Sequence, residues 1–179
     1  GKTSSCTAMY GYLLCSKGII PNCNFDPSGR MSVVYNKDTN EGVYFDIDDN
    51  TPEMVEFKQK NVWAHIKHNS FADALKESII RLFGISRDLI YGTDEDKNTP
   101  THIMWDDVFP LLTQERAIKN AHKAGTVLTI RELCQVFGTD MCRAIDENCH
   151  LRSAVQQSIL DNPEISYIPD GRFANEFFY

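Results

Sequence analysis

Apolar residues recur at every third or fourth position in several stretches of the chain, which is the spacing of one face of an α-helix. These stretches span residues 6–14, 71–83, 130–137 and 151–160, and residues 85–91 add a short helical turn. Gly18, Gly84 and Gly138 follow the first three stretches, and glycine is common immediately after a helix. Asn162 and Pro163 follow the fourth and favour a helix end. The pattern therefore predicts helices that stop at these residues.

The helix expected over residues 130–137 also carries a signal for its start. Thr129 and Glu132 have the spacing of a capping box, in which two side chains bond to each other's backbone N–H groups. Arg131 then falls in the first turn, away from the apolar face. A positive charge at this end opposes the helix dipole, which an anion nearby would offset. Residues 92–101, before this helix, are polar and predict a loop.

Alternating β-branched and aromatic residues predict strands elsewhere. Residues 31–35 and 42–47 have this pattern, and the polar residues 36–41 between them predict the turn of a β-hairpin. Large apolar side chains occur on both faces of the hairpin, so it should pack against something. We expect a surface excursion, within an insertion at residues 19–69, that serves assembly or covers a site. Residues 165–169 predict one more short strand.

Length and composition indicate one domain with one good core. The chain has 179 residues, of which 42% are hydrophobic, and its net charge is −7. Binding to long nucleic acid is not expected, because it depends on a basic surface. No apolar run approaches the roughly 20 residues of a membrane-spanning helix, so no membrane association is expected either. These features predict a soluble protein inside the cell.

The cysteines give no metal-binding pattern. They are Cys6, Cys15, Cys23, Cys134, Cys142 and Cys149. No two of them form the C-x-x-C pair that is typical of zinc sites. Several fall on apolar helical positions, where a reduced thiol behaves as a small hydrophobic group. We therefore interpret them as structural thiols.

The first residues of the chain, Gly1, Lys2, Thr3 and Ser4, have the form of the second half of a phosphate-binding P-loop. In the complete motif, G-x-x-x-x-G-K-[ST], backbone N–H groups cradle phosphates, the Lys neutralises their charge, and the Ser or Thr hydroxyl binds Mg²⁺. All four residues are therefore candidates for ATP binding, and Thr3 for the metal. The strand and half-loop expected before them are absent, and Gly-Lys-Thr also suits a flexible, solvated terminus.

Three separated segments together resemble one family, the deoxynucleoside monophosphate kinases of bacteriophages. The segments are residues 1–4, residues 71–92 with F-A-D-A-L-K-E and L-F-G, and residues 131–140 followed by D-G-R-F-A-N-E at residues 170–176. The resemblance implies a three-layer α/β P-loop kinase fold with a parallel sheet. It also implies transfer of phosphate from ATP, with Mg²⁺, to a deoxynucleoside monophosphate, in the cytoplasm of an infected bacterium.

The resemblance assigns roles to individual residues. Lys2, Arg131 and Asp170 are the implied catalytic residues. The implied substrate-binding residues are Lys76, Arg131, Gly138, Thr139, Asp140, His150, Asp170, Arg172 and Glu176. In this scheme Lys76 and Arg131 hold the acceptor phosphate, and residues 138–140 form a turn against the nucleoside. His150 stands where the family commonly has Trp.

The sequence leaves several alternatives open. Lys76 also suits a solvated helical position, and residues 138–140 also suit a plain helix stop. Residues 19–69 are longer than the corresponding part of the family, and both ends of the sequence look truncated. Another small-molecule P-loop kinase, such as one acting on a dephosphorylated coenzyme, is one alternative. A nucleotide-binding assembly or regulatory protein without catalysis is another. The accepted bases and a homodimer are left open.

Overall fold

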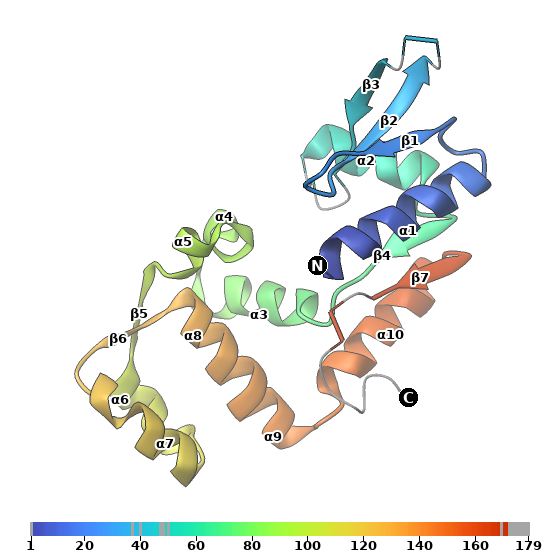
Figure 1. Cartoon of the computed structure of the whole chain (residues 1–179). Coiled ribbons are helices and arrows are strands. Elements are labelled where there is room, and N and C mark those ends of the chain that lie inside the picture. Colours follow the sequence, from blue (N-terminus) through green and yellow to red (C-terminus); the bar gives the residue numbers. More distant parts are fainter. Residues whose placement is uncertain are drawn as a thin grey trace. The chain divides into compact units, whose positions relative to one another are not determined.

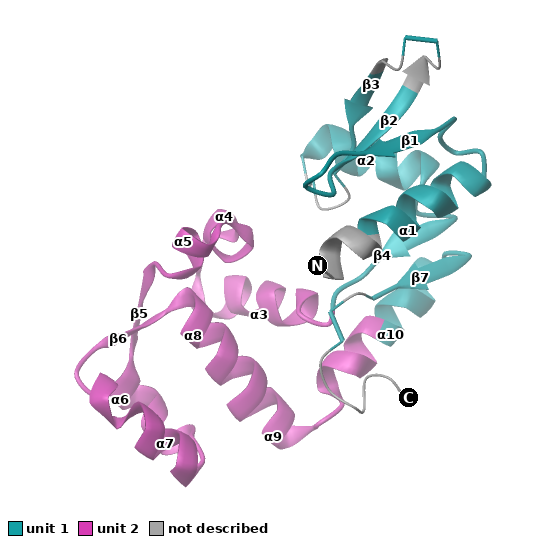
Figure 2. Cartoon of the chain, viewed as in Figure 1, with its two compact units in different colours: residues 1–70, 155–171 teal, residues 71–154, 172–179 magenta. Residues whose placement is uncertain are grey.

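A computed structural model describes residues 2–36, 38–39, 41–46, 49, 51–168 and 170–171, with side chains outside residues 2–6, 35, 36 and 41 (Figure 1). The described chain is mixed α/β with small sheets. It divides into two compact units (Figure 2). Unit 1 comprises residues 1–70 and 155–171, and unit 2 comprises residues 71–154 and 172–179. Each unit has its own buried core, and each is described separately below.

Unit 1 contains a three-stranded antiparallel sheet and a parallel pair of strands. Its elements are α1 (Lys2–Ser16), β1 (Cys23–Phe25), β2 (Met31–Asn36), β3 (Glu41–Tyr44), α2 (Pro52–Asn61), β4 (Ile66–His68) and β7 (Ile165–Tyr167), with the end of α10 (Cys149–Asp161). The antiparallel strands follow the order β1-β2-β3, and β4 pairs with β7 in parallel. Figure 1 shows β4 and β7 side by side, next to α1 and α10.

The predicted hairpin is confirmed as β2 and β3, but it is not a separable excursion. Met31 and Phe45 are buried in one cluster with Tyr10 and Leu14 of α1 and Ile66 of β4. The expectation that the hairpin packs against something is therefore confirmed. Its apolar residues contribute to the core of unit 1, and the role in assembly or in covering a site stays a prediction.

Unit 2 is mostly helical. Its elements are α3 (Asp73–Phe83), α4 (Arg87–Tyr91), α5 (Asp94–Lys97), β5 (Pro100–Met104), α6 (Trp105–Val108), η1 (Phe109–Leu111), α7 (Gln114–Asn120), η2 (Ala121–Lys123), β6 (Val127–Thr129), α8 (Ile130–Gln135), η3 (Val136–Cys142), α9 (Arg143–Ile145) and the start of α10. Strands β5 and β6 are antiparallel. The stretch 92–101, expected as a loop, contains α5 and the start of β5. A core around Ile79, Trp105, Leu128 and Leu133 holds these elements together.

Local signals explain where several helices begin and end. Gly84 ends α3 with a left-handed backbone, φ 65°, which glycine adopts without strain. The capping box of Thr129 and Glu132 is formed at the start of α8, as predicted. The predicted stop at Gly138 is wrong, because the chain continues as the π-helix η3 and then as α9. Residues 138–140 are therefore helical rather than a turn.

Parallel pairing within the described residues is limited to β4 and β7. This arrangement agrees with an α/β class, whereas the layered parallel sheet of a P-loop kinase stays a prediction. The described helices include none with the length and apolarity needed to cross a membrane.

Candidate phosphate-binding site

Helix α1 begins at Lys2, within the predicted P-loop residues. The first N–H groups of a helix have no partner within it and attract anions. No acidic residue occurs in the first turn of α1. Gly1 and the side chains of Lys2, Thr3 and Ser4 lie outside the described residues, so their assigned roles stay predictions.

A buried tyrosine connects α1 to the parallel strands. The Tyr10 hydroxyl donates to the Ile66 carbonyl oxygen of β4 at 3.5 Å, and burial raises the Tyr10 pKa, which keeps the hydroxyl protonated as a donor. Leu14, one turn later, is also buried in the core. These contacts fix α1 against β4.

Asp170 lies at the edge of the sheet where ligands gather in α/β folds. Parallel strands bring their carboxyl ends to one edge, which is the usual ligand side. Ser70 follows β4 and Asp170 follows β7, and the Ser70 hydroxyl donates to Asp170 Oδ2 at 2.6 Å. This bond orients the carboxylate of a residue to which the sequence assigns catalysis. Arg172 and Glu176, predicted beside it, lie outside the described residues.

A buried asparagine fixes the backbone just before Ser70. Asn69 is 6% exposed, and its backbone N–H donates to the Tyr167 carbonyl oxygen at 2.9 Å. Its side-chain amide donates to the hydroxyls of Ser158 at 3.1 Å and Ser166 at 3.2 Å. The end of β4 is thereby held to both β7 and α10. This support gives the Ser70 and Asp170 pair a defined position.

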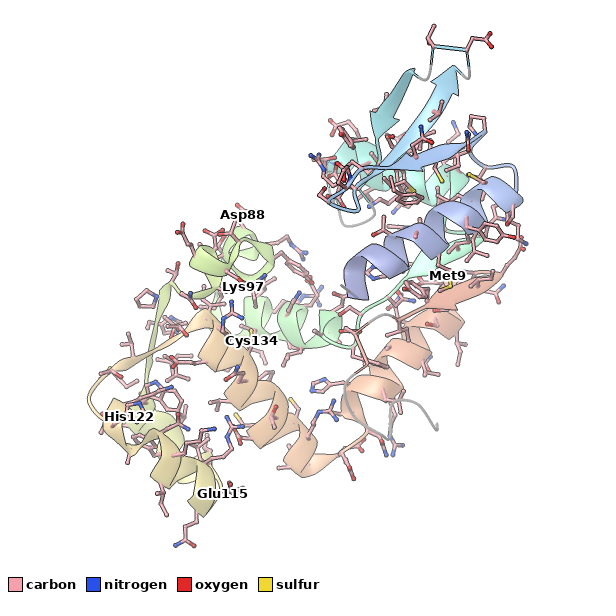
Figure 3. The ribbon with its side chains drawn as sticks, viewed as in Figure 1. Met9, Asp88, Lys97, Glu115, His122 and Cys134 are labelled. Atoms are coloured by element: carbon pink, nitrogen blue, oxygen red, sulfur yellow. The ribbon has the colours of Figure 1, made fainter. Side chains whose placement is uncertain are left out.

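In unit 2, the charges of three cations act on the Cys134 thiol. Burial raises the pKa of Cys134, and the positive charges of Lys76, Lys97 and Arg131 oppose this effect. These residues come from α3, α5 and α8, and Figure 3 labels Lys97 and Cys134. The structure thus brings the predicted phosphate ligands Lys76 and Arg131 into one region. No motif or spacing in the sequence indicated Lys97 as a phosphate ligand, because it lies in a stretch expected to be a polar loop.

Arg131 already has an anionic partner. Its Nη2 donates to Asp94 Oδ1 at 2.7 Å, and its Nε donates to Asn98 Oδ1 at 3.4 Å. The hydrogen bond and charge of Arg131 lower the Asp94 pKa. Exposed ion pairs of this kind contribute little to stability, because water and salt screen them. A phosphate could therefore replace the carboxylate at little cost.

Lys76 lies against an aromatic ring. Its Nζ is 4.5 Å from the centre of the Tyr91 ring, a cation–π distance. The Tyr91 hydroxyl donates to Glu77 Oε1 at 3.0 Å, and burial raises the Tyr91 pKa. The ring orients the lysine stem and leaves the three N–H donors of the ammonium for other acceptors.

The π-helix η3 positions Gly138 and Asp140. The Gly138 carbonyl oxygen accepts from the Arg143 N–H and lies 3.1 Å from His150 Nε2. A Cβ at Gly138 would come within 2.8 Å of a Leu75 methyl group, so a larger residue here would require the Leu75 side chain to shift. The imidazole thus bonds to the helix itself. Thr139 lies in the same π-helical segment.

Asp140 contacts an arginine that sequence reasoning missed. Its side chain is 3% exposed, and Oδ1 is 2.9 Å from Arg116 Nε on α7. Burial raises the Asp140 pKa, and the charge of Arg116 opposes this effect. Asp140 Oδ2 is buried and has no hydrogen-bond partner among the described residues. No spacing or motif links Arg116 to Asp140, because the pair arises only when α7 packs on η3.

The described residues contain no group of three His, Cys, Asp or Glu side chains that could hold a metal ion. Comparisons of the sequence with family models and curated proteins, and of the structure with solved structures, found no match. Function must therefore be inferred from the residues of the chain itself.

Proposed function

We propose that this chain is a P-loop kinase domain that transfers a phosphoryl group from ATP to a deoxynucleoside monophosphate. Three observations on the described residues support the proposal. Helix α1 begins at Lys2, the charges of Lys76 and Arg131 both act on the Cys134 thiol, and Asp170 follows a parallel strand.

The chemistry requires two anions to be held in line while their charge is neutralised. In this proposal the amides and Lys2 at the start of α1 hold the ATP phosphates, and Thr3 binds Mg²⁺. The ion would neutralise charge on the transferred phosphate. Arg131 and Lys76 hold the acceptor phosphate, because guanidinium and ammonium groups are strong phosphate donors. Asp170, whose carboxylate accepts a hydrogen bond from Ser70, has the catalytic role that the resemblance implies.

Release of ADP in a coupled assay, measured with each of the four deoxynucleoside monophosphates, tests this function. We expect acceptor-dependent ADP release that requires Mg²⁺. Lys2→Ala should abolish it with the fold intact, whereas Lys60→Ala, on the exposed side of α2, should leave it unchanged. ATP binding without acceptor-dependent turnover would instead favour a non-catalytic nucleotide-binding protein.

Arg131→Ala separates the two substrate sites. We expect KM for the monophosphate to rise by about tenfold to a hundredfold, the equivalent of a charge-assisted hydrogen bond of about 1.5–3 kcal/mol, with little change for ATP. Arg81→Ala is a matched control, because Arg81 is exposed in the last turn of α3 in the same unit. Equal effects of Arg131→Ala on both substrates would contradict the assignment.

A further inference from the structure

Two cysteine sulfurs are in contact in unit 1. Cys15 lies in the last turn of α1 and Cys23 begins β1, and their Sγ atoms are 3.6 Å apart. Both residues are half-buried and both are reduced. The sequence shows no recognised thiol motif here, because the two cysteines are separated by eight positions.

The fold imposes this contact from both sides. After α1 the chain reverses at Gly18, φ 70°, and the Ile19 N–H donates to the Leu14 carbonyl oxygen at 3.0 Å. On the other side, Cys23 pairs in register with Val33 of β2. These backbone bonds hold the two thiols together without any bond between the sulfurs.

A glycine allows β1 to approach α1 at this point. A Cβ on Gly11 would lie 3.1 Å from Cys23 Sγ and 2.6 Å from Met31 Sδ. A larger residue at this position would require Met31 and Phe25 to shift, and would crowd Cys23. The close approach of the two thiols is therefore a consequence of the packing.

We propose that Cys15 and Cys23 form an intramolecular disulfide when the protein meets a small-molecule disulfide, which would join the end of α1 to β1. A disulfide has its sulfurs about 2.05 Å apart, so the sulfurs must approach by about 1.5 Å, which side-chain rotation and small backbone shifts supply. Among the described residues, Cys15 and Cys23 belong to no group of three side chains that could bind a metal ion.

The reaction balances as two thiol–disulfide exchanges. The Cys15 thiolate attacks one sulfur of the small disulfide, forms a mixed disulfide and releases one small thiol. Cys23 then attacks the Cys15 sulfur and releases the second small thiol. The two cysteines lose two electrons, which reduce the small disulfide, and their two protons end on the released thiols.

The environment of Cys23 disfavours its ionisation. Burial raises the pKa of Cys23 to about 11, and its contact with Cys15 adds to this shift. Cys23 is therefore almost entirely protonated at neutral pH, whereas thiolates are the attacking species. The Cys23 thiol must lose its proton before it attacks.

Glutathione disulfide is the probe for the test. The protein is incubated with it, remaining thiols are alkylated, and the peptides are mapped by mass spectrometry. We expect a peptide pair linked through Cys15 and Cys23 that dithiothreitol separates and that is lost in both Cys15→Ser and Cys23→Ser. Cys134, which is also half-buried, is an internal control that should remain singly alkylated.

A second measurement detects the effect on structure. Hydrogen exchange should slow in α1 and β1 of the oxidised wild-type protein, and this slowing should be absent from Cys15→Ser treated in the same way. Linkage of either cysteine to another partner, including Cys6, would overturn the proposal. Stable glutathione adducts at Cys15 without closure would overturn it as well. Neither readout depends on kinase activity, so this inference and the proposed function can fail separately.

Discussion

At the scale of single residues, the Ser70 hydroxyl orients the carboxylate of Asp170, to which we assign a catalytic role. Ser70 donates to Asp170 Oδ2, and the preceding residue, Asn69, is fixed by its own buried hydrogen bonds. A short, well-oriented bond to a charged group contributes more than a neutral one. The proposed acceptor site should therefore depend on Ser70 although Ser70 belongs to none of the recognised motifs.

We predict that Ser70→Ala lowers kcat by about tenfold, the equivalent of about 1.4 kcal/mol, because Asp170 loses the bond that orients it. KM for ATP should stay within about twofold. Ser70→Thr keeps the hydroxyl and should restore most of the turnover. Steady-state kinetics of the two variants check this prediction, and equal losses in both would contradict the hydrogen-bonding role.

Arg131 illustrates a competition between a protein carboxylate and a substrate. Asp94 pairs with Arg131 at 2.7 Å, so the substrate must displace this carboxylate. We predict that Asp94→Asn lowers KM for the monophosphate by about twofold to fivefold, because exposed pairs contribute about 1 kcal/mol or less. Kinetics at low and high salt provide the measurement. A higher KM would mean that Asp94 helps to hold Arg131 in place.

The placement of a residue on a helix could be predicted from sequence, whereas its contacts with residues far along the chain could not. The spacing of apolar residues predicts that Lys76 and Arg131 lie on helices, and both do, on α3 and α8. Ser70 and Arg116 gave no signal, because their partners lie far along the chain, 100 positions away for Ser70. Contacts at such separations depend on how elements pack, which single-sequence patterns do not encode.

At the scale of elements, the start of α8 was predictable and its end was not. The capping box is a local signal that needs only Thr129 and Glu132. The expected stop at Gly138 assumed a left-handed glycine, but Gly138 is used for its small size against Leu75 and His150. Glycine serves both purposes, so sequence alone could not distinguish a helix end from a close contact.

We predict that Glu132→Gln lowers the free energy of unfolding by about 1 kcal/mol at pH 7. Burial alone would raise the Glu132 pKa, but hydrogen bonds from Lys123 and Thr129 outweigh it and the pKa is lowered. A lowered carboxyl pKa stabilises the fold above the usual value of about 4.3, and this contribution is lost as pH falls through the folded pKa. The difference between wild type and variant should therefore shrink as pH falls below about 4.3 and through the lower folded pKa.

Denaturant unfolding of both proteins between pH 3 and 7 measures this difference. Glu115→Gln is the matched control, because Glu115 is exposed in the first turn of α7 (Figure 3). It should show a smaller difference at pH 7. A deficit of Glu132→Gln that persists at pH 3 would instead indicate a packing defect.

At the scale of the whole molecule, the class could be predicted but the sheets could not. The periodicity of apolar residues predicts helices α1, α3, α8 and α10 and the hairpin. These elements account for much of the mixed α/β structure. The strand predicted over residues 165–169 is confirmed as β7, whereas β4 and β6, also of three residues each, had no sequence pattern that indicated a strand. The division into two units also escaped prediction, because it depends on which buried clusters form.

The two cores share no residue, which predicts separate responses to a cavity. Leu14 in unit 1 and Leu128 in unit 2 are both 0% exposed, so Leu14→Ala and Leu128→Ala are matched substitutions. Each should lower the stability of its own unit by about 2–5 kcal/mol.

We predict that Leu14→Ala accelerates hydrogen exchange in α1, β2 and β4, and that Leu128→Ala accelerates it in α3, β6 and α8. Helix α10 runs through the boundary and should respond to both, because its backbone hydrogen bonds continue from one unit into the other. Exchange measured by mass spectrometry distinguishes the outcomes, since equal acceleration across the whole chain in either variant would mean that the units unfold as one cooperative body.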